Sequence, residues 1–284
     1  MKPKNPMQLK ALIKNKAAEK KLSAQLIMQN YMMERLLERI SVSEYKNNFI
    51  LKGGFLIAAI VGLDSRATMD LDTTIKGFTL THESISKIFE DICAIEIDDE
   101  IKFELIRTNE IREGDEYPGI RVSLAAIYPP LNVPLSVDVT TGDRITPKEI
   151  EYSFKLLFDD RSISILAYNV ETVLAEKLET ILSRNVANTR PRDFYDVHIL
   201  AMMQNEIIDF AVLKQALDET TQRRGSHEVL TNYKNIVDGI QSSTNMRGHW
   251  EKYQNAKQVY NLVFRARNAL KIILEKDGFI YEEQ

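Results

Sequence analysis

The amino-acid sequence predicts an α+β core followed by a helical region. The first observation is a set of apolar segments that are rich in β-branched residues and end before residue 140, which is typical of strands. The second is that apolar residues recur at helical spacing through almost all of the chain after Tyr168. Because the pattern changes near residue 165, we expect one domain over residues 1–165 and a helical domain over residues 166–284.

The composition is that of an ordinary globular protein with a sizeable core. Of the 284 residues, 44% are hydrophobic and 27% are charged. The formal net charge of -4 gives no global basic field, so nucleic-acid binding would require a local basic patch. The single cysteine, Cys93, excludes an intramolecular disulfide, and its apolar neighbours predict a buried structural thiol.

The sequence shows no targeting or membrane signal. The N-terminus runs polar and basic, without the apolar core of a signal peptide. The apolar stretch at residues 55–61 is far too short to cross a bilayer. We therefore expect a soluble, cytoplasmic protein with no membrane partner.

Hydrophobic spacing places the individual elements. In the first helical segment we expect the charged residues Glu34, Arg35, Glu38 and Arg39 on solvated faces. A proline-rich turn at residues 128–131 joins two strands, and we expect the strands to pair antiparallel. The expected helices are 8–40 (with Ser23 as an N-cap), 55–62, 82–95, 170–183, 191–204, 209–218, 226–241 and 251–275. The expected strands are 69–75, 104–107, 119–127 and 131–139.

The most informative local feature is the pair of carboxylates Asp70 and Asp72. On a strand, residues two apart point to the same face, so the two carboxylates project together. A divalent cation would relieve their repulsion, and hard oxygen ligands suit Mg²⁺ or Mn²⁺. The alternative is a solvent-facing side of the strand with two harmless acids, and the pair alone does not exclude it.

Asp138 could add a third carboxylate. It lies in a strand with apolar neighbours, so a partly buried acid is implied. Three acids on neighbouring strands could complete a two-cation site for phosphoryl or nucleotidyl transfer. The alternative is an acid close to the turn at Thr140-Thr-Gly-Asp143, and residue pattern alone does not choose between the two.

Gly53 and Gly54 stand between a strand and a helix, with Lys52 beside them. Glycines in this position let backbone N–H groups approach a phosphate, and the helix N-terminus favours negative charge. Since Gly-Gly pairs are also common in ordinary turns, their position just upstream of Asp70 and Asp72 is what favours a nucleotide-binding role.

The order of these features resembles the signature of the nucleotidyltransferase superfamily. Within it, the sequence is similar to the AbiEii/AbiGii toxins of type IV toxin–antitoxin systems, which act in abortive infection. One departure is that the second position of the glycine pair is Gly rather than Ser, which removes a hydroxyl contact to phosphate. The likeness spans roughly residues 50–200 and is carried by Lys52-Gly-Gly54, Arg66-Ala-Thr-Met-Asp-Leu-Asp72, Val137-Asp-Val139, Val173-Leu-Ala-Glu-Lys-Leu-Glu-Thr-Ile-Leu-Ser-Arg184 and Arg190-Pro-Arg-Asp-Phe-Tyr-Asp196.

The resemblance implies a nucleotidyltransferase-like core with a mixed or antiparallel sheet, an N-terminal helix and a C-terminal helical domain. It further implies a pyrophosphate-releasing enzyme in which an acceptor hydroxyl, expected on tRNA, attacks an NTP. The biological outcome would be growth arrest in phage defence, controlled by a separately encoded antitoxin. The implied ligands of Mg²⁺ (or Mn²⁺) are Asp70, Asp72 and Asp138, and the implied nucleotide contacts are Lys52, Gly53, Gly54, Arg66, Lys177 and Arg184.

Lys177 falls on the inward side of the apolar stripe of its helix, and Arg184 follows two helical turns later. A lysine directed inward needs an anionic partner, which could be triphosphate or a nearby acid. Asp193 and Asp196 share a helical face, and the resemblance implies that one of them is needed for activity, by orienting Lys177 or the acceptor. A structural pair with Arg190 or Arg192 is the alternative.

Two other functions remain open at this point. Arg184, Arg190 and Arg192 form a cationic strip that could hold an RNA backbone, but surface arginines are usually only solvated charge. The acceptor could therefore be a small molecule or a protein instead of tRNA. A non-catalytic NTP-binding module is the remaining alternative, and the intact set of Asp70, Asp72, Asp138 and Lys177 argues against it.

Overall fold

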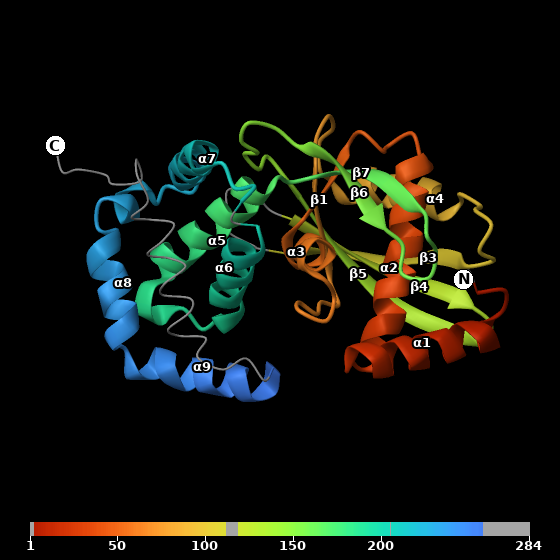
Figure 1. The fold of residues 1–284 in the computed structure, drawn as a ribbon. Helices are drawn as coiled ribbons and strands as arrows, with labels where there is room; N and C mark the ends of the chain where they lie inside the picture. The colour runs from red at the N-terminus through yellow and green to blue at the C-terminus, as the bar shows by residue number, and fades with distance from the viewer. Residues whose placement is uncertain (1–2, 112–118, 205, 258–284) are drawn as a thin grey trace. The chain divides into compact units, whose positions relative to one another are not determined.

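A computed structural model describes residues 3–111, 119–204 and 206–257 (Figure 1). The chain forms two compact units. The first comprises Met1–Asp143 and Glu149–Tyr168, and the second comprises Arg144–Lys148 and Asn169–Gln284. The short segment Arg144–Lys148 is therefore part of the second unit, although it precedes the last strands of the first.

The first unit is built on a seven-stranded mixed sheet with the order β3-β4-β5-β2-β1-β7-β6. Most neighbours pair antiparallel, but β2 pairs parallel with β5 and β1 pairs parallel with β7. The sheet is therefore mixed, one of the two forms expected, and only the narrower expectation of antiparallel partners fails at these two places. The strands are β1 (Phe49–Lys52), β2 (Leu71–Ile75), β3 (Lys102–Ile111), β4 (Gly119–Tyr128), β5 (Leu131–Thr141), β6 (Ile150–Lys155) and β7 (Ser162–Ala167).

Parallel pairing requires a long connection between the partners, and alternation of residues along a strand carries no information on its direction. The β2–β5 pairing encloses α4 (His82–Cys93), β3 and β4, so the chain travels out to the sheet edge and returns. Strands β6 and β7, which the sequence pattern did not indicate, form an antiparallel hairpin at the other edge.

Helices α1 (Pro6–Lys20), α2 (Ala24–Val42), α3 (Gly53–Val61) and α4 complete the first unit. The expected single helix over residues 8–40 is two helices, because Lys21 adopts a left-handed conformation (φ 55°) that ends α1. Ser23 caps α2 as expected, its hydroxyl accepting the N–H of Leu26 at 3.2 Å. α2 packs against β5 and β7, where Leu36, Val137 and Val139 are fully buried.

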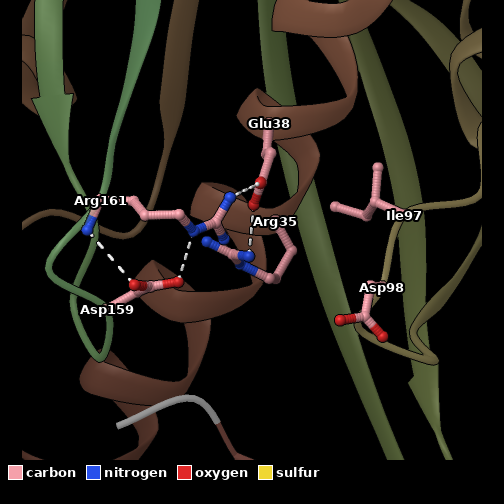
Figure 2. A pocket seen from close by; sticks show the side chains of 6 residues that line it. All are labelled: Arg35, Glu38, Ile97, Asp98, Asp159 and Arg161. Carbon is pink, nitrogen blue, oxygen red and sulfur yellow. Dashed lines mark hydrogen bonds and ion pairs between the residues drawn. The ribbon is translucent and has the colours of Figure 1, made fainter.

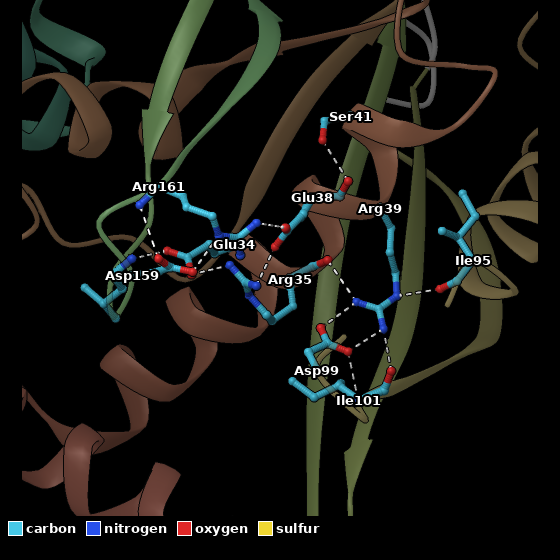
Figure 3. A network of polar contacts seen from close by, with 11 residues as sticks. Glu34, Arg35, Glu38, Arg39, Ser41, Ile95, Asp99, Ile101, Asp159 and Arg161 are labelled. Atoms are coloured by element: carbon cyan, nitrogen blue, oxygen red, sulfur yellow. Dashed lines mark hydrogen bonds and ion pairs between the residues drawn. The ribbon is translucent and has the colours of Figure 1, made fainter. Parts of the chain in front are cut away.

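The charged residues of α2 are buried, so their expected placement on solvated faces was wrong. Glu34, Arg35, Glu38 and Arg39 are all at most 8% exposed. They can be buried because they are paired: Arg35 bonds Glu34 and Glu38, Arg161 bonds Glu38, and Arg39 forms a double hydrogen bond with Asp99 (Figure 3). Spacing along one helix does not show partners that come from other segments.

A pocket of about 270 Å³ lies beside this network, lined by Arg35, Glu38, Ile97, Asp98, Asp159 and Arg161 (Figure 2). Most of its charged lining is engaged in internal ion pairs. None of the residues that the sequence singled out for chemistry lines it, so the candidate site lies elsewhere.

In its described residues the second unit is helical, as the sequence pattern predicted after Tyr168. The described helices are α5 (Val170–Arg184), η1 (Asn185–Ala187), α6 (Pro191–Met203), α7 (Phe210–Arg223), η2 (His227–Leu230), α8 (Tyr233–Ser242) and α9 (Thr244–Lys257). The part of the expected helix 251–275 beyond residue 257 lies outside the described residues. Within the described ranges, no helix is both long and apolar enough to cross a membrane.

Cys93, expected to be buried, is half-buried, and burial raises the pKa of its thiol to about 11.

Candidate functional site

Four charged residues form a row across the polar face of the sheet in the first unit. Lys52 on β1 is the register partner of Asp72 on β2, which pairs with Asp138 on β5, which pairs with Arg121 on β4. Register partners point to the same face, and neighbouring strands lie about 4.8 Å apart. Asp72 and Asp138 therefore lie side by side on neighbouring strands, as one of the two sequence interpretations of Asp138 predicted. Their strand neighbours Leu71, Val137 and Val139 are fully buried on the opposite face.

The guanidinium of Arg121 forms a bidentate ion pair with the carboxylate of Asp138. Nε donates to Oδ1 at 2.7 Å and Nη2 donates to Oδ2 at 2.8 Å. This hydrogen bonding and the charge of Asp138 raise the pKa of Arg121, and the charges of Asp70 and Asp72 add to the effect. Asp70 is exposed and lies just before β2. The negative charges of all three predicted carboxylates thus stabilise the positive charge of Arg121, a residue that the sequence pattern had not indicated.

The donor set is chemically suited to a hard divalent cation, since it offers carboxylate oxygens from Asp70, Asp72 and Asp138. In the part of the chain that the structure describes, no three His, Cys, Asp or Glu side chains stand in a metal-binding arrangement. At Asp138 both carboxylate oxygens accept hydrogen bonds from Arg121. The carboxylates thus fit a divalent cation by their chemistry, and Arg121 is the cation that neutralises Asp138 in this structure.

The glycine pair lies against Asp72. β1 runs directly into α3, and the N–H of Gly54 donates to Asp72 Oδ2 at 3.3 Å. Gly53 has φ +63°, and a β-carbon at this position would lie 2.2 Å from Asp72 Oδ2. A residue with a side chain fits neither the conformation nor the space. We call Asp70, Asp72 and Asp138 the carboxylate row. The start of α3 is in direct contact with this row through Asp72.

Lys52 and Arg66, both expected to contact nucleotide, are buried. The Lys52 amine pairs with Asp143, which also accepts hydrogen bonds from Thr140 at 2.9 Å and Tyr168 at 3.0 Å. Burial alone would raise the pKa of Asp143, but the Lys52 charge and these hydrogen bonds outweigh it and lower the pKa to about 2. The guanidinium of Arg66 lies 2.9 Å from where a Gly54 side chain would begin.

In the second unit, Lys177 on α5 meets both acids of α6. Its amine lies 2.6 Å from Asp193 Oδ1 and 3.0 Å from Asp196 Oδ2. A nearby acid, which the sequence left open as one partner of Lys177, is thus present twice. Burial lowers the pKa of Lys177, but the charges of Asp196 and Asp193 and their hydrogen bonds outweigh it, so the pKa is raised.

Asp196 is fully buried, whereas the Lys177 side chain keeps 20% exposure. The second oxygen of Asp193, Oδ2, is buried without a hydrogen-bond partner among the described residues. Arg184, Arg190 and Arg192 are exposed at the end of α5 and the start of α6.

Sequence reasoning missed Arg121, although a signal for it exists. Tyr128 pairs with Leu131 across the Pro129-Pro130 turn, and the register then runs without interruption to Arg121 and Asp138. Counting back from the turn would have placed the arginine opposite the acid. Asp143 was also missed, because its pairing with Lys52 connects two segments far apart in the chain.

The comparisons with known proteins agree with this architecture. A protein from H. pylori assigned as a nucleotidyltransferase has 14% identity and a TM-score of 0.51, with 90% of this chain and 97% of that chain covered. JHP933 from Helicobacter pylori also has 14% identity and a TM-score of 0.51, with 90% and 94% covered. At this identity the likeness shows the fold alone. No functionally curated protein is detectably similar in sequence to this chain.

The decisive comparison is with a protein family. Residues 35–260 match the family described as the nucleotidyl transferase AbiEii toxin of type IV toxin–antitoxin systems. The match covers β1, the carboxylate row and α5–α6, so it includes both sets of residues described above. The mixed sheet, the carboxylate row at the start of α3 and this family match together make the chain a member of the AbiEii nucleotidyltransferase toxin family.

Proposed function

We propose that this protein transfers a nucleotide from an NTP to a hydroxyl of tRNA, with a divalent cation, and so arrests growth as the toxin of a type IV toxin–antitoxin pair. The observation that carries the proposal is the register pairing of Asp72 with Asp138, beside Asp70 and the glycine-led start of α3. Membership of a type IV toxin family implies a separate antitoxin partner.

Asp70, Asp72 and Asp138 would hold Mg²⁺ or Mn²⁺. When bound, such cations clamp NTP phosphates, lower the pKa of the attacking hydroxyl and stabilise the departing pyrophosphate. Asp138, whose side chain is 18% exposed, is suited to orient the acceptor hydroxyl and accept its proton. The bond between the α-phosphorus and that hydroxyl oxygen forms as the bond to pyrophosphate breaks.

Backbone and cationic groups would position the triphosphate. Gly53 and Gly54 leave the start of α3 open to close approach, and the helix N-terminus favours negative charge. Lys177 and Arg184 are further contacts in the proposal, with Asp193 and Asp196 fixing the Lys177 amine in place. Lys52 and Arg66 are buried, so we assign them to shaping the β1–α3 junction instead of contacting the triphosphate directly.

The choice of tRNA as acceptor is supported by charge. Arg184, Arg190 and Arg192 are exposed and close together in sequence on a chain whose net charge is -4. A local cationic strip of this kind attracts a nucleic-acid backbone, whereas a cationic drug would require an acidic surface. Nucleotide attachment to tRNA would deplete functional tRNA and so stop translation.

The test is to incubate the protein with Mg²⁺, each labelled NTP in turn and total bacterial tRNA. We expect label in tRNA, dependent on Mg²⁺, for the wild type and for D160A, which removes an exposed aspartate of the same unit. D70A and D72A should lose labelling. Label on the protein itself, or on small molecules only, would move the acceptor away from tRNA, and absence of labelling with every NTP would exclude catalysis.

A further inference from the structure

The row of charges contains a cation of its own. Arg121 forms two hydrogen bonds of 2.7 and 2.8 Å with Asp138, and these occupy both carboxylate oxygens. Double, charge-assisted bonds of this geometry are among the strong ones in proteins. Asp138 is thus already neutralised before any ligand arrives.

Arg121 differs from the buried cations Lys52 and Arg39 in its exposure to solvent. Its side chain is 46% exposed, whereas Lys52 is 6% exposed and Arg39 is 2% exposed. β3 flanks Arg121 with Asn109, an exposed and uncharged residue. With this exposure, we expect that rotation of the side chain into solvent is enough to free Asp138.

A divalent cation needs the same oxygens. Asp72 and Asp138 are register partners, and Asp138 is also the register partner of Arg121, so a cation shared by these acids would compete with the guanidinium for Asp138. Two cations at one carboxylate pair repel each other, so the arginine and the metal compete.

From this arrangement we infer that Arg121 is a displaceable internal counter-ion, which holds Asp138 in the resting protein and which a divalent cation must expel. It is a positioning residue for the site, because it acts through Asp138. The inference rests on the proposed function for its biological sense. Arg121 keeps the affinity for free cation low, so that the cation is loaded together with the NTP that carries it.

The test measures binding of Mn²⁺ to the full-length protein without nucleotide, by loss of the free Mn²⁺ signal in electron paramagnetic resonance. We expect R121Q to bind Mn²⁺ about tenfold more tightly than the wild type, because a hydrogen-bonded charge pair no longer opposes binding. R121K keeps the charge but loses the bidentate hydrogen bonding. Its affinity for Mn²⁺ should therefore fall between those of the wild type and R121Q.

The matched control is R107Q. Arg107 on β3 pairs with Ser123, two residues from Arg121 on the same face, so this variant removes the same charge from the same face without touching Asp138. R107Q should change the affinity by less than about threefold, since exposed charges are screened. In a D138N background, R121Q should give no gain.

The outcomes separate the two proposals. Tighter Mn²⁺ binding by R121Q without tRNA labelling by the wild type would support the counter-ion and overturn the proposed reaction. Metal-dependent labelling by the wild type, together with equal Mn²⁺ affinity for R121Q, R107Q and wild type, would overturn the counter-ion alone. If neither the wild type nor a folded R121Q binds Mn²⁺, both the counter-ion and the metal-dependent part of the reaction fail.

Discussion

Gly53 and Asp72 approach each other so closely that a β-carbon on Gly53 would lie 2.2 Å from the Asp72 carboxylate. Gly53 also adopts φ +63°, which residues with a side chain rarely take. The strand-to-helix junction and the carboxylate row therefore constrain each other, and one substitution should disturb both.

We expect G53A to reduce nucleotidyl transfer by about a hundredfold, because displacement of a catalytic group by about 1 Å can cost that much. Gly225 is the matched control, with the same φ of +63° and no atom within 4 Å of its added β-carbon. G225A should cost about 1 kcal/mol of stability from backbone strain alone and leave transfer unchanged. Equal activity of the two variants would show that the contact with Asp72 is unimportant.

The Lys177 pair gives a prediction on stability. K177M removes the cation that pairs with Asp193 and with the fully buried Asp196. We expect a loss of about 3 kcal/mol in the free energy of unfolding, measured by urea denaturation. K252M, at an exposed lysine of α9, is the control and should change it by less than about 0.5 kcal/mol. Restoration of part of the loss in K177M/D193N/D196N would identify the buried charge as the cause.

Two arginines of the first unit should differ sharply in their contribution to the free energy of unfolding. Arg39 is 2% exposed and donates to both oxygens of Asp99 and to the carbonyls of Arg35, Ile95 and Ile101. Arg161 also bonds an acid of α2, Glu38, but its side chain is 52% exposed.

R39M should lower the free energy of unfolding by about 4 kcal/mol, because it leaves the buried Asp99 carboxylate without its ion-pair partner. R161M should lower it by at most about 1 kcal/mol. Neither residue belongs to the carboxylate row, so nucleotidyl transfer per folded molecule should match the wild type in both. Similar losses of stability for R39M and R161M would contradict the assignment of Arg39 as the buried anchor.

Much of the fold was predictable because its signals are local. The caps at Ser23 and Gly62, the amphipathic α4 and the Pro129-Pro130 turn each depend on residues a few positions apart. The parallel β2–β5 pairing was not, because strand direction is set by tertiary connections. The same limit hid the partners of Lys52 and Arg39, which come from segments 91 and 60 residues away.

Glu34 illustrates this limit and gives a prediction on pH. It is buried beside Arg35 and Glu38 and accepts the N–H of Leu157. Burial raises its pKa to about 7, since the charge of Arg35 and the hydrogen bonds offset only part of the desolvation cost. In the unfolded chain the pKa of a glutamate is about 4.3.

The sign follows from proton binding. Between pH 4.3 and about 7 the folded state holds a proton at Glu34 that the unfolded state has lost, so Glu34 lowers stability as the pH rises. E34Q lacks this titration and should gain stability relative to the wild type over that window, by up to about 3 kcal/mol, and then stay level above pH 8. Urea denaturation at pH 5, 6, 7 and 8 measures the difference. A constant difference across the four values would mean that Glu34 is ionised throughout and that Arg35 holds its charge.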